Sequence, residues 1–153
     1  MEGVVAPMLD FYKGRHVLVT GHTGFKGAWL CEILSMAGAE VTGFSLPPAS
    51  NPNLYQIAHI GELIDSRFGD IRSLDALKAA FDAAQPEVVF HLAAQPIVRE
   101  GYRDPVGTYS TNVMGTVHLL ECVRQCPGSQ STSGTLTLYA PISMFWKRWG
   151  RIF

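Results

Sequence analysis

The sequence has few cysteines, almost no excess of charge and no long apolar run. Cysteine occurs three times in 153 residues, an odd number that indicates reduced thiols rather than a disulfide framework. The formal net charge of −1 provides no basic field for nucleic acid. No stretch approaches the ~20 apolar residues of a membrane span, and residues 1–10 lack the basic and apolar regions of a signal peptide. We therefore expect a cytoplasmic protein without a nucleic-acid or membrane partner.

A metal site is also not expected. Cys122 and Cys126 are four residues apart, but no further histidine or cysteine accompanies them at the spacing of a zinc site. We interpret both as ordinary buried or half-buried thiols.

Short apolar segments alternate with helical patterns along most of the chain. Strands are expected at 16–20, 41–44, within 62–68 and at 87–92, and helices at 28–37, 74–84 and about 105–125. This alternation predicts an α/β fold with a Rossmann-type doubly wound parallel sheet. We expect the sheet to end after the fourth strand and its following helix. The tail from Cys126 does not continue the alternation, although residues 135–139 carry a weak strand pattern.

The strongest functional signal is a glycine-rich turn between the first strand and the first helix. Its glycines are Gly21, Gly24 and Gly27, in the pattern G-x-x-G-x-x-G. The first permits a tight turn, the second allows a diphosphate to approach the backbone, and the third allows the helix to pack against the strand. A purely structural glycine turn is the alternative, and a P-loop is excluded because no Gly-Lys-Ser/Thr follows. His22 and Lys26 either contact phosphate or are solvated loop residues.

Two further clusters follow later strands. Asp70, after the third strand, either accepts a hydrogen bond from an adenine amino group or serves as a turn aspartate. Ala93 and Ala94, after the fourth strand, are small enough for a nicotinamide ribose to pass close to the backbone. We expect His91 to be a core histidine rather than a catalyst.

These motifs together resemble a known family. The run from Phe11 to Gln125 resembles the extended short-chain dehydrogenase/reductases, and among them the CDP-glucose 4,6-dehydratases, through GHTGFKG, GDIRSLDAL, HLAAQPIVREGY and TNVMGTVHLLE. The resemblance implies tightly bound NAD and a nucleotide-sugar substrate. Hydride leaves sugar C4, water is lost across C5–C6, and the hydride returns to C6.

The resemblance also implies which residues form the site. It assigns the pyrophosphate to Gly21, Thr23, Gly24, Phe25 and Gly27, the adenine to Asp70 and Ile71, and the ribose–nicotinamide end to Leu92, Ala93, Ala94 and Gln95. Asn112 matches the helix asparagine that supports the active site in this family. Alternatively, Asn112 only bonds locally to backbone.

The sequence departs from the family pattern in two places. The second strand ends at Ser45, where many NAD enzymes carry an acidic residue on the ribose, so the choice of NAD over NADP rests on the resemblance. The catalytic Tyr-x-x-x-Lys is absent, because Tyr139 is followed four residues later by Ser143. We therefore expect no catalytic residue of its own, inactivity of this chain alone, and no substrate domain.

The division of the chain follows from these departures. We expect residues 1–125 to form an NAD-binding half-domain and residues 126–153 to be an atypical tail, read in a shifted frame or an alternative end. A homodimer is typical of the family but doubtful here, because the helix that should carry Tyr-x-x-x-Lys is missing. Two other functions stay open: a non-catalytic dinucleotide-binding module, and a fragment of a sugar-nucleotide epimerase or reductase.

Overall fold

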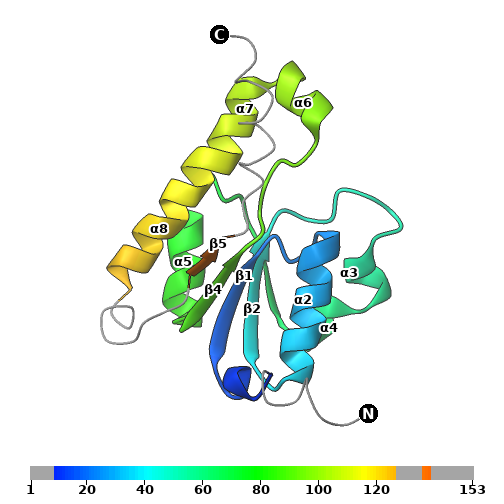
Figure 1. The fold of residues 1–153 in the computed structure, drawn as a ribbon, viewed down its shortest axis with the longest axis vertical. Helices are drawn as coiled ribbons and strands as arrows, with labels where there is room; N and C mark the ends of the chain where they lie inside the picture. The colour runs from blue at the N-terminus through cyan, green and yellow to red at the C-terminus, as the bar shows by residue number, and fades with distance from the viewer. Residues whose placement is uncertain (1–8, 127–135, 139–153) are drawn as a thin grey trace.

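The fold is a single parallel sheet with helices on both faces (Figure 1). The computed structural model describes residues 9–126 and 136–138. The sheet has the order β3-β2-β1-β4-β5, and every neighbouring pair is parallel. Its strands are β1 (His16–Thr20), β2 (Glu40–Ser45), β3 (Asp65–Phe68), β4 (Val88–His91) and β5 (Leu136–Leu138). The predicted Rossmann-type fold class is therefore confirmed.

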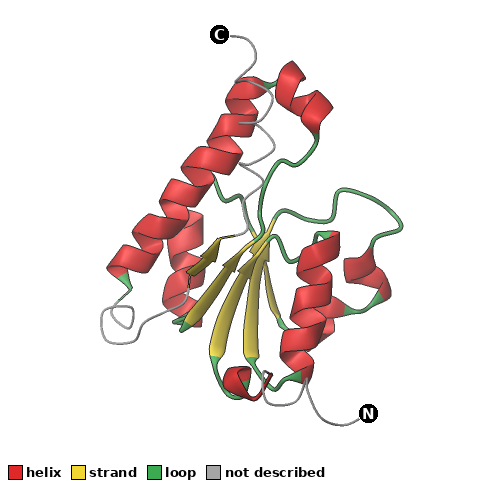
Figure 2. Ribbon diagram, in the orientation of Figure 1, coloured by secondary structure: helices red, strands yellow, loops and turns green. Residues whose placement is uncertain are grey.

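Alternate residues of each strand serve the two faces of the sheet. Val17 and Val19 of β1 belong to the apolar cluster beneath α2 (Phe25–Met36), whereas Leu18 belongs to the cluster beneath α5 (Leu74–Ala84). Strands covered on both faces are expected to be apolar, as residues 17–19 of β1 are. The two clusters lie on opposite faces of the sheet. Helices cover both of these faces (Figure 2).

The helices begin and end where the sequence provides the signals for it. Ser73 caps α5 by accepting a hydrogen bond from the amide of Ala76, as predicted. The first long helix starts at Phe25, three residues before the predicted start at Ala28, because the glycine turn itself forms its first turn. The remaining short helices, which the sequence analysis did not predict, are η1 (Asp10–Tyr12), α3 (Leu54–Ile57), α4 (Ile60–Leu63) and α6 (Val98–Arg103).

The predicted helix at 105–125 is present but not uniform. It consists of α7 (Pro105–Tyr109), the π-helical segment η2 (Ser110–Met114) and α8 (Gly115–Gln125) in direct succession. Asp104 caps its start by accepting a hydrogen bond from the Gly107 amide at 2.9 Å. A π-helical turn inside an α-helix is a common feature of functional sites, which directs attention to residues 110–114.

The expectation that the sheet ends after the fourth strand is wrong. β5 adds a fifth strand, in which Leu136 and Leu138 pair in parallel with Val89 and His91 of β4. The strand pattern at 135–139 was too weak to outweigh the polar loop before it. Apart from Cys126 and β5, the tail predicted for 126–153, including Tyr139 and Ser143, lies outside the described residues.

The cysteines behave as expected. Cys31 and Cys122 are buried and Cys126 is partly exposed, and none of the three forms a disulfide. Burial raises the pKa of Cys31 to about 12 and that of Cys122 to about 11, so both are protonated core residues. Within the described residues, no helix has the length and apolarity to cross a bilayer.

Candidate functional site

The glycine turn folds tightly between β1, α2 and the loop after β4. Gly21 has φ +78°, and a Cβ there would lie 2.7 Å from the amide nitrogen of Ala93. At Gly27 an added Cβ would overlap the carbonyl oxygen of Gly21. Both positions therefore require glycine, the first for its backbone conformation and its close approach to the next chain segment, the second for the close approach of α2.

The N-terminus of α2 is open. Gly24 is the N-cap, no side chain caps the helix, and its first turn contains no acidic residue. The first amides of an α-helix have no acceptor within the helix. Together with the helix dipole, these amides favour an anion. The turn thus presents donors to whatever lies in front of it.

A cavity of about 990 Å³ lies in front of this turn, at the carboxyl ends of the strands. This is the size of a ligand site, and the carboxyl edge of an open parallel sheet is where such folds bind ligands. All of the predicted cofactor residues line it, namely Gly21, Thr23, Gly24, Phe25, Gly27, Asp70, Ile71, Leu92, Ala93, Ala94 and Gln95. The structure therefore brings together residues that are up to 74 positions apart (95 − 21 = 74).

Thr23 and Ser45 join the glycine turn to the end of β2. Their hydroxyl oxygens lie 2.7 Å apart, and both are within 2.9 Å of the carbonyl oxygen of Leu46. One hydroxyl can therefore donate to the other while the second donates to the carbonyl. Ser45 lines the cavity where a ribose-binding carboxylate is otherwise common.

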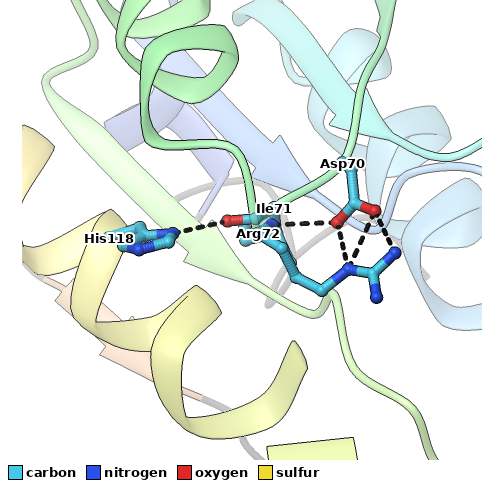
Figure 3. Close-up of polar contacts among 4 residues, drawn as sticks. All are labelled: Asp70, Ile71, Arg72 and His118. Carbon is cyan, nitrogen blue, oxygen red and sulfur yellow. Dashed lines mark hydrogen bonds and ion pairs between the residues drawn. The ribbon is translucent and has the colours of Figure 1, made fainter. Parts of the chain in front are cut away.

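Asp70 is engaged by a neighbour in the loop after β3 (Figure 3). Its Oδ1 accepts a hydrogen bond from the amide of Arg72 at 2.9 Å, and its carboxylate forms an ion pair with the Arg72 guanidinium. The hydrogen bonds from the Arg72 side chain lower the pKa of the Asp70 carboxyl below its usual value, so it is ionised at neutral pH.

Ile71 is a core residue as well as part of the cavity wall. It is 5% exposed and packs against Gly115 at the start of α8. Its carbonyl oxygen lies 3.1 Å from Nδ1 of His118, which comes from α8 (Figure 3). The loop after β3 is thereby attached to the long helix.

Asn112 does not line the cavity but holds a segment that does. Its Oδ1 accepts a hydrogen bond from the amide of Gln95 at 2.7 Å, and its Nδ2 donates to the Gln95 carbonyl at 3.1 Å. The alternative of purely local backbone bonding is therefore wrong. The Gln95 side chain also donates to Oγ1 of Thr108, at 2.9 Å. The sequence analysis missed Thr108, which no pattern marks.

The structure tests the predictions made for two histidines near the site. His22 is not a solvated loop residue, so that expectation is wrong, and its buried side chain is not part of the cavity lining. It is fully buried over Gly43, where no side chain occupies the space, and its Nε2 lies 2.7 Å from the hydroxyl of Ser66. His91 is 2% exposed, which confirms it as a core histidine. Burial lowers the pKa of each to about 4.

A metal centre finds no support in the described part of the chain. Across residues 9–126 no group of three or more His, Cys, Asp or Glu side chains is arranged to hold a metal ion.

Comparison with known proteins agrees with this geometry. The family model described as GDP-mannose 4,6 dehydratase matches residues 18–139, which continues past the end of the resemblance at Gln125. CDP-glucose 4,6-dehydratase of Salmonella typhimurium is 51% identical over 116 residues, 76% of this chain and 32% of that protein. GDP-mannose 4,6-dehydratase of Vibrio cholerae is 32% identical over 117 residues, 72% of this chain and 31% of that protein.

Solved structures give the same result for the fold. The epimerase Mth375 of Methanothermobacter thermautotrophicus aligns with a TM-score of 0.66 at 28% identity, over 80% of this chain and 35% of that chain. UDP-glucose 4-epimerase of Brucella ovis in complex with NAD aligns with a TM-score of 0.65 at 27% identity, over 75% of this chain and 34% of that chain. The chain spans about a third of the length of the relatives it matches. It belongs to the GDP-mannose 4,6 dehydratase family of sugar-nucleotide enzymes, within the extended short-chain dehydrogenase/reductases.

Proposed function

We propose that this chain binds NAD and forms the cofactor-binding part of a CDP-glucose 4,6-dehydratase. The observation that carries the proposal is the open N-terminus of α2, which faces a cavity lined by every residue predicted to contact the cofactor. A dinucleotide fits this arrangement because a diphosphate needs backbone donors and close backbone approach. The glycine turn supplies both.

The rest of the cavity suggests how the two halves of the cofactor lie. We infer that Asp70 and Ile71 flank the adenine, and that the segment Leu92–Gln95 faces the ribose–nicotinamide end. The ion pair with Arg72 leaves Asp70 ionised and fixed in orientation, as an acceptor for an adenine amino group must be. Ala93 and Ala94 offer no bulk that would block a ribose.

The proposed chemistry divides between the cofactor and the protein. A bound NAD would supply the hydride acceptor of the reaction. The residues of this chain would bind and orient it through the glycine turn, the β2 end and the loop after β4. The sequence contains no Tyr-x-x-x-Lys for proton transfer, so we propose that this chain alone does not turn over substrate.

The nucleotide sugar is inferred from the relatives. The Salmonella typhimurium protein named CDP-glucose 4,6-dehydratase is 51% identical, whereas the Vibrio cholerae protein named GDP-mannose 4,6-dehydratase is 32% identical. We propose the first activity for the whole protein because the identity is higher over nearly the same length. A non-catalytic dinucleotide-binding module would bind NAD as well, and neither alternative predicts turnover by this chain alone.

A pair of substitutions at Gly24 tests the cofactor site. Gly24 has extended backbone angles at the N-cap, where an aspartate caps a helix well. Gly24→Asp should therefore keep or raise the melting temperature, but its charge should repel the diphosphate and abolish NAD binding. Gly24→Ala, the uncharged control, should retain more NAD affinity. Equal NAD binding by wild type and Gly24→Asp would contradict a diphosphate at this helix.

Turnover is tested separately. We expect the chain, incubated with NAD and CDP-glucose, to form no keto sugar. Formation of a 4-keto-6-deoxy sugar would contradict the proposed inactivity and would show that another residue takes the part of the missing tyrosine.

A further inference from the structure

A chain of buried and partly buried hydrogen bonds runs from the end of β1 to the long helix. Nδ1 of His91 lies 2.7 Å from Oγ1 of Thr20, and Nε2 of His91 lies 3.1 Å from Oγ1 of Thr116. The Thr116 hydroxyl donates to the backbone carbonyl of Asn112 at 2.7 Å. His91 therefore connects the end of β1 with the π-helical segment η2.

The direction of every bond in this chain is fixed. Because the Thr116 hydroxyl gives its proton to the Asn112 carbonyl, it must accept from Nε2 of His91. Nδ1 of the neutral imidazole then accepts, and the Thr20 hydroxyl donates to it. The lowered pKa of His91 agrees with a neutral ring, which has one donor and one acceptor.

Both ends of the chain hold the same loop. At one end, Oγ1 of Thr20 accepts from the amides of Leu92 and Ala93 at 3.2 and 3.3 Å. At the other end, Asn112 binds both backbone groups of Gln95 with its side chain. The loop that lines the cavity is thus clamped at its start and at its end.

We propose that His91 is a positioning residue for the nicotinamide half of the cofactor site. By bonding Thr20 and Thr116 at once, it fixes the distance between the end of β1 and the start of α8, and so the shape of the segment Leu92–Gln95. His91 does not touch the cofactor and is not a catalytic residue. The inference rests on the proposed NAD binding. It adds that affinity for the nicotinamide half depends on the hydrogen bonds that link Thr20, His91, Thr116 and Asn112, which we call the relay.

Thr116 offers the mildest way to break the relay. Thr116→Val keeps the shape of the side chain but removes the hydroxyl that accepts from His91 and donates to Asn112. Thr116→Ser keeps the hydroxyl and is the matched control. His91→Gln is a second test, because the glutamine amide nitrogen can take the place of Nε2 toward Thr116, while the amide oxygen does not occupy the position of Nδ1 toward Thr20.

Two ligands separate positioning from general destabilisation. ADP carries the adenosine diphosphate half alone, whereas NAD carries both halves. We expect Thr116→Val to weaken NAD binding about tenfold, the equivalent of one buried hydrogen bond, and to leave ADP binding within about twofold. His91→Gln should show the same selectivity, and Thr116→Ser should bind both ligands as wild type does.

Three results would overturn the inference. Parallel losses of NAD and ADP affinity would mean that His91 and Thr116 only stabilise the fold. Unchanged NAD affinity in Thr116→Val would mean that the relay does not shape the site. Wild-type binding of ADP but not of NAD would mean that the nicotinamide half has no site here. A folded wild type that binds neither ligand would instead contradict the proposed function itself.

Discussion

The Asn112 side chain forms two hydrogen bonds with the backbone of Gln95, one at its amide and one at its carbonyl. The two residues are 17 positions apart, one in the π-helical segment η2 and one in the loop after β4. An asparagine can make such a pair because its amide carries both a donor and an acceptor. The pair fixes the cavity wall to the long helix.

Removal of this clamp should lower stability. Asn112→Ala leaves both partly buried backbone groups of Gln95 without their partner, which costs roughly 1–3 kcal/mol. Urea unfolding measures the change in the free energy of unfolding. Val113→Ala is the matched control, because Val113 is the next residue on the same segment and is exposed. Equal losses in the two variants would show that the clamp does not contribute.

Gly27 should be far less tolerant than Gly14. An alanine at Gly27 would overlap the Gly21 carbonyl, so α2 must move away from β1, at a cost of about 3 kcal/mol. Gly14 has a similar positive φ to Gly21 but open space around it, so Gly14→Ala should cost only about 1 kcal/mol. Thermal unfolding of both variants checks this order. A Gly27→Ala protein as stable as Gly14→Ala would contradict the close packing of the turn.

The two buried histidines should make the protein acid-sensitive. Burial lowers the pKa values of His22 and His91 to about 4 in the folded protein, from the ordinary value of 6.5. The unfolded chain therefore binds more protons between these values, and stability must fall as the pH falls from about 6.5 toward 4. The full contribution is present above pH 6.5. From pH 7 to pH 5 the loss should be about 2 kcal/mol for each histidine.

Urea unfolding at pH 7, 6 and 5 measures this dependence. His22→Gln removes one of the two titrating groups, so the loss between pH 7 and pH 5 should be roughly halved. His59→Gln is the control, because His59 is exposed and forms only a surface ion pair with Glu62. A pH dependence that survives in the double variant of His22 and His91 would assign the effect to other groups.

The residue at position 45 should set the ratio of the affinities for NAD and NADP. No carboxylate stands at the end of β2, where it would repel a 2′-phosphate, so we expect wild-type affinities for NAD and NADP within about tenfold of each other. Ser45→Asp should lower the affinity for NADP more than for NAD. Ser45→Asn introduces a side chain of nearly the same size as aspartate but without its charge, so it should not change the ratio of the NAD and NADP affinities. Parallel changes in both affinities would place the ribose elsewhere.

The local features of the site could be predicted from the sequence. The glycine turn, the N-cap at Ser73 and the alternation of strands depend on neighbouring residues, which the sequence displays directly. Asp70, Ala93 and Ala94 followed from the rule that ligands bind at the carboxyl ends of parallel strands, whereas the family resemblance assigned Thr23, Phe25, Ile71, Leu92 and Gln95. Their common cavity confirms that the positions are adjacent and leaves the ligand to experiment.

The features that the sequence analysis did not predict depend on residues that are distant in the sequence. His22 is buried because Gly43, on a different strand, leaves room for its ring, and no local pattern reveals this pairing. The relay through Thr20 and Thr116 joins residues 96 positions apart (116 − 20 = 96). The fifth strand gave only a weak pattern at 135–139 and was not counted in the sheet, because its pairing with the distant β4 is not visible in its own residues.

Calorimetric titration of the folded, monodisperse chain with NAD tests the central claim most directly. We predict saturable binding with one NAD per chain, which Gly24→Asp abolishes without loss of folding. A folded protein that shows no heat of binding with NAD, NADP or ADP would contradict the account. The cavity at the glycine turn would then not be a dinucleotide site in this chain.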